Sequence, residues 1–407
     1  MKLDTKFVRR QFPAFSEKSL KGLAHFENAG GSYACGPVID RLTRYYRARK
    51  MQPYGPSKPS RKGGAEMDLA RARMAALLNV AEDAVHFGPS TTQNTYVLAQ
   101  AFRMILGPGD AIVVTDQDHE ANSGPWRRLE YEGVEIREWK MDPDTGHLDP
   151  ARLEDLLDDR VRLVCFPHCS NVIGEINDVA QIAGRVRAAG AVACVDGVSY
   201  APHGLPDITA LGADIYLFST YKTYGPHQGI MVLRPELAET LPAQGHWFNA
   251  GTVTKRLTPA GPDHAQVAAC AGIADYVDAL AEAHGLGGDT AAARGAKVHD
   301  LMRAHEIGLL APLMEFLRGK NGLRVLGPAD PAMRAPTVAI QTDRPGRAVA
   351  EDLEPFGIMA DGGDFYAVRA LEASGVDPAH GVLRVSFVHY TTRKEVDRLI
   401  AALDAVL

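Results

Sequence analysis

The feature that most constrains the fold is a series of short apolar runs, separated by amphipathic stretches, between residues 111 and 234. Runs of this length and composition are typical of strands buried on both faces, as in a mostly parallel sheet. The segment 179–189 carries apolar residues at helical spacing and ends near Gly190, where a helix C-cap is expected. The alternation predicts βαβ units and hence an α/β fold. The expected strands are 111–115, 161–166, 191–195, 213–218 and 229–233.

Patterns outside this region predict a second, smaller part. From residue 323 onward, strand and helix patterns alternate in a way that is typical of an α+β domain. We therefore expect an N-terminal segment (1–20) that packs with the small domain, a large domain (21–262), and a linker helix with a small C-terminal domain (263–407). The further expected elements are helices over 64–78, 92–104, 265–283, 310–317, 347–356 and 393–407, strands over 337–341 and 382–387, and an ordered loop over 51–64.

The composition is that of a globular protein in a reducing compartment. Nearly half of the 407 residues are apolar, yet no run approaches the length needed to cross a bilayer, so we expect no membrane span. Residues 1–15 lack the apolar core of a signal peptide, which favours a cytoplasmic location. Five cysteines without a CxxC pair fit reduced thiols. A net charge of −6 without charge blocks argues against a nucleic-acid partner.

Lys222 lies in the segment Ser219–Gly225, directly after a predicted buried strand. Ligands of open α/β sheets bind at the carboxyl ends of the strands, which is where this lysine is expected. The preceding strand ends in Asp196, so a carboxylate reaches the same edge. Pyridoxal 5′-phosphate (PLP) needs such a pair, because its aldehyde condenses with a lysine amine and its pyridine nitrogen stays protonated beside a carboxylate. Taken without the other, Lys222 would be interpreted as a surface residue, and Asp196 would be interpreted as a helix N-cap.

A run of hydroxyl residues precedes the helix predicted over 92–104. Ser90, Thr91 and Thr92 together offer hydroxyl groups and free backbone N–H groups at a helix start. Such a turn can bind the phosphate of PLP. Because serine and threonine open many helices that bind nothing, this feature carries weight only beside Lys222 and Asp196.

With these residues in place, the sequence resembles the fold type I PLP enzymes of the class V aminotransferase group, specifically the cysteine desulfurase-like proteins. The resemblance runs from Phe26-Glu-Asn-Ala-Gly30 to the Tyr390–Asp397 tail, with several motifs in order. It implies a large domain with a mostly parallel sheet flanked by helices, a smaller α+β domain, PLP as cofactor, a small amino-acid substrate, and a homodimer with active sites at the interface.

The resemblance also implies roles for individual residues. His119 would stack on the cofactor ring, Asn171 would contact its 3′-oxygen side, and Asp196 would pair with the pyridine nitrogen. Lys222 would form the Schiff base. The phosphate would be held by Thr91, Thr92 and Ser219.

Arg384 would bind the substrate carboxylate, and Asn28 would also face the substrate. An arginine within an apolar strand needs an anionic partner, which a bidentate carboxylate would supply. The competing interpretation is an internal salt bridge.

The departures from the family pattern bear on the reaction. Desulfurases carry a nucleophilic cysteine on a loop before the carboxylate-binding arginine, whereas the segment 358–369 here contains none. Without a thiolate acceptor, persulfide formation is not expected. The sequence instead carries Asp361-Gly-Gly-Asp-Phe-Tyr366, similar to a desulfurase-like subgroup. Tyr221 stands where desulfurases usually have histidine, and its hydroxyl can donate to the phosphate. Ser199 stands where they usually have glutamine. The segment 261–264 replaces a threonine that a neighbouring subunit often contributes to the phosphate site.

The reaction itself stays open at this point. We rank β-elimination of the carbon–sulfur lyase type ahead of transamination, and epimerisation third, on family analogy. A non-catalytic PLP-binding protein is a further alternative. Ser219-x-x-Lys222 also matches the S-x-x-K signature of acylating serine enzymes, but it follows a strand and lacks the companion motifs. No metal site is expected, because no group of residues has the spacing of a zinc set.

Overall fold

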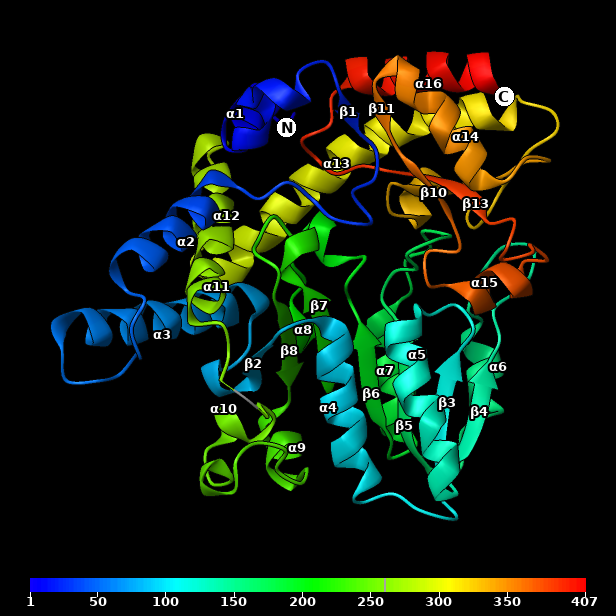
Figure 1. Ribbon diagram of the computed structural model, residues 1–407. Helices are drawn as coiled ribbons and strands as arrows, with labels where there is room; N and C mark the ends of the chain where they lie inside the picture. The colour runs from blue at the N-terminus through cyan, green and yellow to red at the C-terminus, as the bar shows by residue number, and fades with distance from the viewer. Residues whose placement is uncertain (260) are drawn as a thin grey trace.

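The predicted buried strands form a seven-stranded sheet in the computed structural model, which describes residues 1–259 and 261–407 (Figure 1). The strand order is β2-β8-β7-β6-β5-β3-β4. β8 runs antiparallel to β2 and β7, and the other neighbours are parallel, so the mostly parallel α/β fold is confirmed. The strands are β2 (Val85–Gly88), β3 (Ala111–Thr115), β4 (Glu135–Trp139), β5 (Val161–Pro167), β6 (Val192–Asp196), β7 (Ile215–Ser219) and β8 (Gly229–Leu233).

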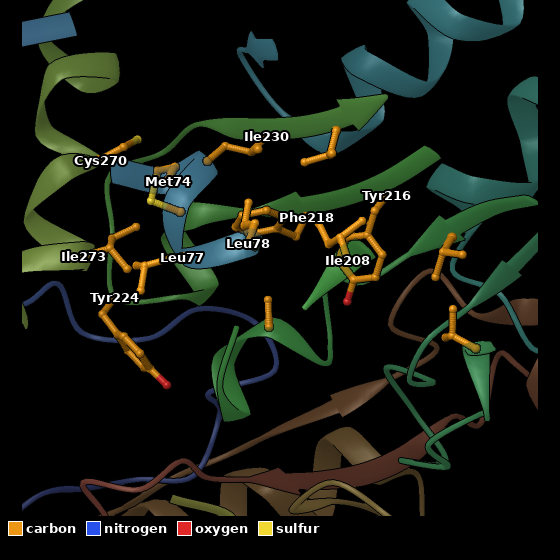
Figure 2. Packing of buried hydrophobic residues seen from close by; sticks show 14 of the residues in the cluster. Met74, Leu77, Leu78, Ile208, Tyr216, Phe218, Tyr224, Ile230, Cys270 and Ile273 are labelled. Carbon is orange, nitrogen blue, oxygen red and sulfur yellow. The ribbon is translucent and has the colours of Figure 1, made fainter. Parts of the chain in front are cut away.

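The sheet forms because alternate residues of its apolar strands pack into separate cores on its two faces. In β7, Phe218 joins the core that covers one face, whereas Leu217 joins the core on the other. Figure 2 shows the first core, where Phe218 and Ile230 of the sheet lie near Met74 and Leu78 of α3 (Lys58–Leu78). Every residue of β3, β7 and β8 is buried, which explains why the sequence pattern was clearest there.

Helices cover both faces of the sheet (Figure 1). The first face is covered by α3, α7 (Val179–Ala188) and α12 (Ala271–Ala283). The second face is covered by α4 (Thr91–Arg103) and α5 (Glu120–Arg127), which contribute Phe102 and Trp126 to its core. The ends of α4 and α5 that follow β2 and β3 therefore lie at the edge of the sheet where the parallel strands finish.

The C-terminal part is a four-stranded antiparallel sheet with helices, which confirms the predicted α+β arrangement. Its strand order is β12-β13-β10-β9. A separate apolar core fills it, built from residues of both the strands and the helices. The elements are α13 (Ala291–Arg318), β9 (Arg324–Val325), β10 (Thr337–Gln341), α14 (Gly346–Leu353), β12 (Asp361–Gly363), β13 (Val382–Ser386) and α16 (Arg393–Val406).

The N-terminus is joined to the C-terminal part. Strand β1 (Ala24–His25) pairs in parallel with β11 (Ile358–Met359), and both lie beside α13 and α16 in Figure 1. Arg9 of α1 (Thr5–Arg10) forms an ion pair with Glu395 of α16 at 2.8 Å. In turn α11 (His264–Ala269) and α12 pack against α2 (Gly36–Ala48) and α3. The domain limits at 20 and 262 stay predictions, because segments before and after each limit contact both parts of the molecule.

Three predicted elements differ from the structure. The loop expected over 51–64 is wrong from residue 58 onward, because the Ser57 hydroxyl accepts from the Ser60 amide and starts α3 there. The helix expected over 265–283 is divided at Cys270 into α11 and α12. The helix expected over 310–317 is the last third of α13, which begins at a Thr290 cap. Cap and break positions depend on single hydrogen bonds, which apolar periodicity does not report.

The remaining elements are short and connect those above. No helix in the described ranges is long and apolar enough to span a membrane. The short connecting elements are η1 (Pro13–Ser16), η2 (Lys18–Leu20), η3 (Glu82–Ala84), η4 (Arg128–Glu132), α6 (Pro150–Glu154), η5 (Ala201–His203), α8 (Ile208–Leu211), η6 (Thr220–Lys222), α9 (Pro235–Thr240), η7 (Trp247–Asn249), α10 (Val253–Arg256), η8 (Pro331–Met333), η9 (Glu354–Phe356) and α15 (Val368–Ala373).

Candidate functional site

A pocket opens where β5, β6 and β7 end and where α4 and α5 begin. Parallel strands deliver their last residues to one edge, and the helix starts add backbone N–H groups there. Its lining includes every predicted cofactor contact except Ser90. The lining residues are Thr91, Thr92, His119, Ala121, Pro167, Cys169, Asn171, Asp196, Val198, Ser199, Ser219, Tyr221 and Lys222.

Lys222 ends the short helix η6, which follows β7 directly. The side chain is buried, and burial lowers the pKa of the amine to about 8, helped by the positive charge of Arg384. The Thr223 hydroxyl donates to the Ser219 carbonyl at 3.2 Å, which ties the turn to the end of the strand. The amine is therefore held in the pocket with a much larger unprotonated fraction than that of a surface lysine.

Asp196 is the last residue of β6 and faces the same pocket. The Val198 amide donates to its Oδ1 at 2.8 Å, which fixes the carboxyl group. Burial nonetheless raises the pKa of Asp196 to about 6, because a buried carboxylate loses its hydration. Such a carboxylate is stabilised by a cationic or N–H partner placed in the pocket.

The predicted phosphate contacts meet at the start of α4. The hydroxyl oxygens of Thr91 and Ser219 lie 2.8 Å apart, so the helix start and the end of β7 are in contact. Ser90 is the N-cap of α4, and its hydroxyl accepts from the Gln93 amide at 3.1 Å. Ser90 thus caps α4 and does not line the pocket, and its predicted contact with the cofactor stays a prediction.

His119 is the N-cap of α5. Its Nδ1 accepts from the Ala121 amide at 3.0 Å, which orients the ring across the pocket. Burial lowers the pKa of His119 to about 3, with the charges of Lys222 and Arg384 adding to the effect. The imidazole is therefore neutral at physiological pH.

Asn171 and Tyr221 also line the pocket. The Asn171 amide nitrogen donates to the carbonyl of Phe365 at 2.9 Å, whereas its buried Oδ1 has no donor among the described residues. The Tyr221 ring stacks on His227, with centroids 4.7 Å apart and planes 7° from parallel. Ser199 lies on the wall after Asp196. The roles predicted for these residues stay predictions, although their positions agree with them.

Arg384 and Asn28 do not line this pocket in the described structure. Arg384 is buried in β13, and its Nη2 forms an ion pair with Glu27 at 3.0 Å while its Nη1 donates to the Asn171 carbonyl at 3.0 Å. The competing interpretation, an internal salt bridge, is thus present. The Asn28 amide nitrogen donates to the carbonyls of His25 and Ser386, at 3.0 and 3.2 Å, and its oxygen accepts from a tyrosine hydroxyl. Asn28 holds the N-terminal segment in place.

Sequence reasoning assigned no role to three residues that contact Arg384 or the pocket-lining residues Asn171 and His119. Glu27 pairs with Arg384, and the Phe365 ring lies 3.7 Å from the Arg384 guanidinium carbon. Tyr366 lies beside His119, with ring centroids 5.5 Å apart. Phe365 and Tyr366 both have positive φ, a backbone conformation that sequence patterns do not reveal for aromatic residues. Glu27 stands within Phe26–Gly30, and the two aromatic residues stand within Asp361–Tyr366, but nothing in the sequence marks contacts between segments this far apart.

The donor set fits PLP. An amine, a carboxylate that requires a cationic or N–H partner, and a cluster of hydroxyl groups at a helix start match the aldehyde, the ring nitrogen and the phosphate of that cofactor. The unpaired Oδ1 of Asn171 offers a further acceptor for a hydroxyl group in the pocket. Each group lies at the edge where an α/β fold binds ligands.

The chain is similar over nearly its whole length to known proteins. Residues 24–399 match the family model described as aminotransferase class-V. An aminotransferase-like protein, FGM3, from Gibberella zeae is 35% identical over 98% of both chains. A cysteine desulfurase from Serratia proteamaculans is 30% identical over 98% of this chain and 97% of its own.

Solved structures agree on the fold. The cysteine desulfurase CsdA from Escherichia coli superposes with a TM-score of 0.82 at 23% identity, covering 99% of this chain and 98% of its own. A cysteine desulfurase from Thermococcus onnurineus NA1 gives 0.86 at 22% identity, covering 100% and 98%. The family match and the full-length relatives together show that the chain belongs to the class V aminotransferase family and is a PLP-dependent enzyme of fold type I.

Proposed function

We propose that the enzyme performs a β-elimination on a small amino acid, of the carbon–sulfur lyase type, without a persulfide cysteine. The observation that carries this proposal is that a buried Lys222 with a lowered pKa and Asp196 line one pocket, in which the thiol of the lining residue Cys169 has a raised pKa. Bound PLP would supply an electron sink for charge that develops at the substrate Cα. The chain's own residues supply the proton transfers and the orientation.

Lys222 is the proposed base. Because its amine is buried and its pKa is about 8, it can accept the Cα proton near neutral pH and return it to the leaving group or to the product. Asp196 would keep the ring nitrogen of the cofactor protonated, and the Thr91, Thr92 and Ser219 hydroxyls would hold the phosphate. The neutral ring of His119 would pack against the cofactor without adding charge.

The cysteine nearest to these groups supports the proposal. Cys169 lines the pocket, but it is buried, and burial raises the pKa of its thiol to about 12. Its Sγ donates to the Gly174 carbonyl at 3.4 Å. A thiol in this state is protonated and engaged, so it is a poor nucleophile. A leaving sulfur group would therefore depart into solvent, without transfer to the protein.

Arg384 is the proposed anchor for the substrate carboxylate. It carries a permanent charge, it contacts Asn171 at the rim of the pocket, and its Nε is buried without an acceptor among the described residues. A carboxylate on the substrate would satisfy that donor. The proposed assembly is a homodimer, as the family resemblance implies, and light scattering on the purified protein measures it directly.

The test combines spectroscopy with product analysis. The purified enzyme should show a visible cofactor band that is absent from Lys222→Ala and present in Lys320→Ala, which removes a surface lysine paired with Asp404. A panel of cysteine, cystine, serine and alanine is then added. Pyruvate and ammonia from the sulfur amino acids would support the proposal. A keto acid formed with loss of the band would indicate transamination. A change of enantiomer would indicate epimerisation, and the absence of any turnover would indicate a binding protein. Each of these three outcomes rejects the proposed β-elimination.

A further inference from the structure

The guanidinium of Arg384 has two bidentate edges, and they share Nη2, the atom that donates to Glu27. Nη1 and Nη2, which form one edge, donate to the Asn171 carbonyl and to Glu27. The other edge consists of Nη2 and Nε, and Nε is buried without an acceptor in the described part of the chain. Nη2 carries one N–H group on each edge, so a carboxylate that bound Nε and Nη2 would lie next to the Glu27 carboxylate and compete with it for Nη2.

The face of the guanidinium is closed by Phe365. Its ring lies 3.7 Å from the guanidinium carbon, and its carbonyl accepts from the Asn171 amide at 2.9 Å. A ligand therefore cannot approach Arg384 from above this plane while Phe365 holds its place. A carboxylate that binds Arg384 would therefore take Nε and Nη2 in the plane of the guanidinium, next to the Glu27 oxygen.

Glu27 is the more exposed partner of the ion pair. Its side chain is 30% exposed, whereas that of Arg384 is 3% exposed. Gly30 leaves the room that Glu27 occupies, because a Cβ at Gly30 would lie 2.0 Å from the Glu27 Oε1. The backbone of Glu27 is fixed by its bridge to Ser386, two residues beyond Arg384. The carboxylate can thus rotate toward solvent while its backbone stays in place.

We propose that Glu27 is a specificity-determining residue that occupies the Nη2 position of Arg384 until a substrate carboxylate replaces it. This inference rests on the proposed role of Arg384 as the carboxylate anchor. A carboxylate gains both Nε and Nη2, and so it can outcompete the single contact of Glu27. A ligand with a neutral amide in place of the carboxylate cannot. Glu27 therefore sets the affinity for free amino acids and their preference over the corresponding amides.

The experiment measures binding without turnover. Propionate carries a carboxylate but no amine, so its dissociation constant from the holoenzyme can be followed by ligand-observed NMR. Glu27→Gln should tighten propionate binding by about tenfold, the equivalent of one charge-assisted hydrogen bond that no longer has to be replaced. Glu351→Gln is the matched control, since it removes an exposed glutamate paired with Arg347, and it should leave binding unchanged. Propionamide should bind weakly to the parent enzyme.

Two variants keep the outcomes distinct. If Arg384→Gln binds propionate as well as the parent does, Arg384 is not the anchor, and both the proposed role and this inference fail. If Arg384→Gln loses binding but Glu27→Gln leaves it unchanged or weaker, the inference alone is overturned. Glu27→Asp retains the charge on a shorter side chain and should also tighten binding, which provides a second test should Glu27→Gln fold poorly.

Discussion

The lowered pKa of Lys222 makes a quantitative prediction for the cofactor-free enzyme. Only the unprotonated amine attacks an aldehyde, and with a pKa of about 8 the amine is protonated below that pH and free above it. At pH 7 about one molecule in ten carries the free amine, roughly 200-fold more than for an ordinary lysine with a pKa of about 10.4. The rate of PLP capture should therefore rise as the pH increases to about 8 and then level off.

The assay is a stopped-flow measurement of the visible cofactor band after cofactor-free enzyme is mixed with PLP between pH 6 and 10. Nα-acetyl-lysine in solution is the control, and its rate should still be rising at pH 10. Arg384→Met removes a positive charge that lowers the pKa of Lys222, so its plateau should move to higher pH. A protein rate that climbs with the control through pH 10, without a plateau, would refute the burial argument.

Three further changes and one control substitution test the site and its support. Asp196→Asn should weaken PLP binding by about 10- to 100-fold, because a charge-assisted contact to the ring nitrogen is lost, as fluorescence titration measures. Phe12→Ala should lower the free energy of unfolding by about 4 kcal/mol in a urea titration, since this buried ring contacts five other aromatic or imidazole rings. Gly174→Ala should cost about 3 kcal/mol, because φ is +74° and the new Cβ would lie 2.4 Å from the Thr337 carbonyl, whereas Gly190→Ala, at φ +77° with open space, should cost about 1 kcal/mol.

The sequence was most informative where one physical requirement dominates. Strands β3, β7 and β8 are buried on both faces, so their apolar runs could be located almost to the residue. The pocket followed from the same reasoning, because Asp196 is the last residue of the buried strand β6 and Lys222 lies in the short helix that follows β7. Their proximity needs only the rule that parallel strands finish at one edge.

Contacts between distant segments could not be predicted in this way. The pairing of Glu27 with Arg384 and the placement of Phe365 over the guanidinium depend on how the N-terminal segment and the segment after β12 meet the C-terminal sheet. No local sequence pattern predicts the contacts between these segments and the C-terminal sheet. The positive φ of Phe365 and Tyr366 is a further example, since aromatic residues rarely adopt it and only the surrounding contacts impose it.

The parallel pairing of β1 with β11 has a consequence for synthesis on the ribosome. Residues 24–28 emerge early, but their partners, Ile358, Met359 and Ser386, emerge almost last. The seven-stranded sheet ends at residue 233, so it can assemble while the leading segment still lacks its neighbours. Arg384 and its ion pair with Glu27 are therefore completed only in the final stage, and a nascent chain stalled before residue 384 would hold the seven-stranded sheet with Lys222 and Asp196 but without that ion pair.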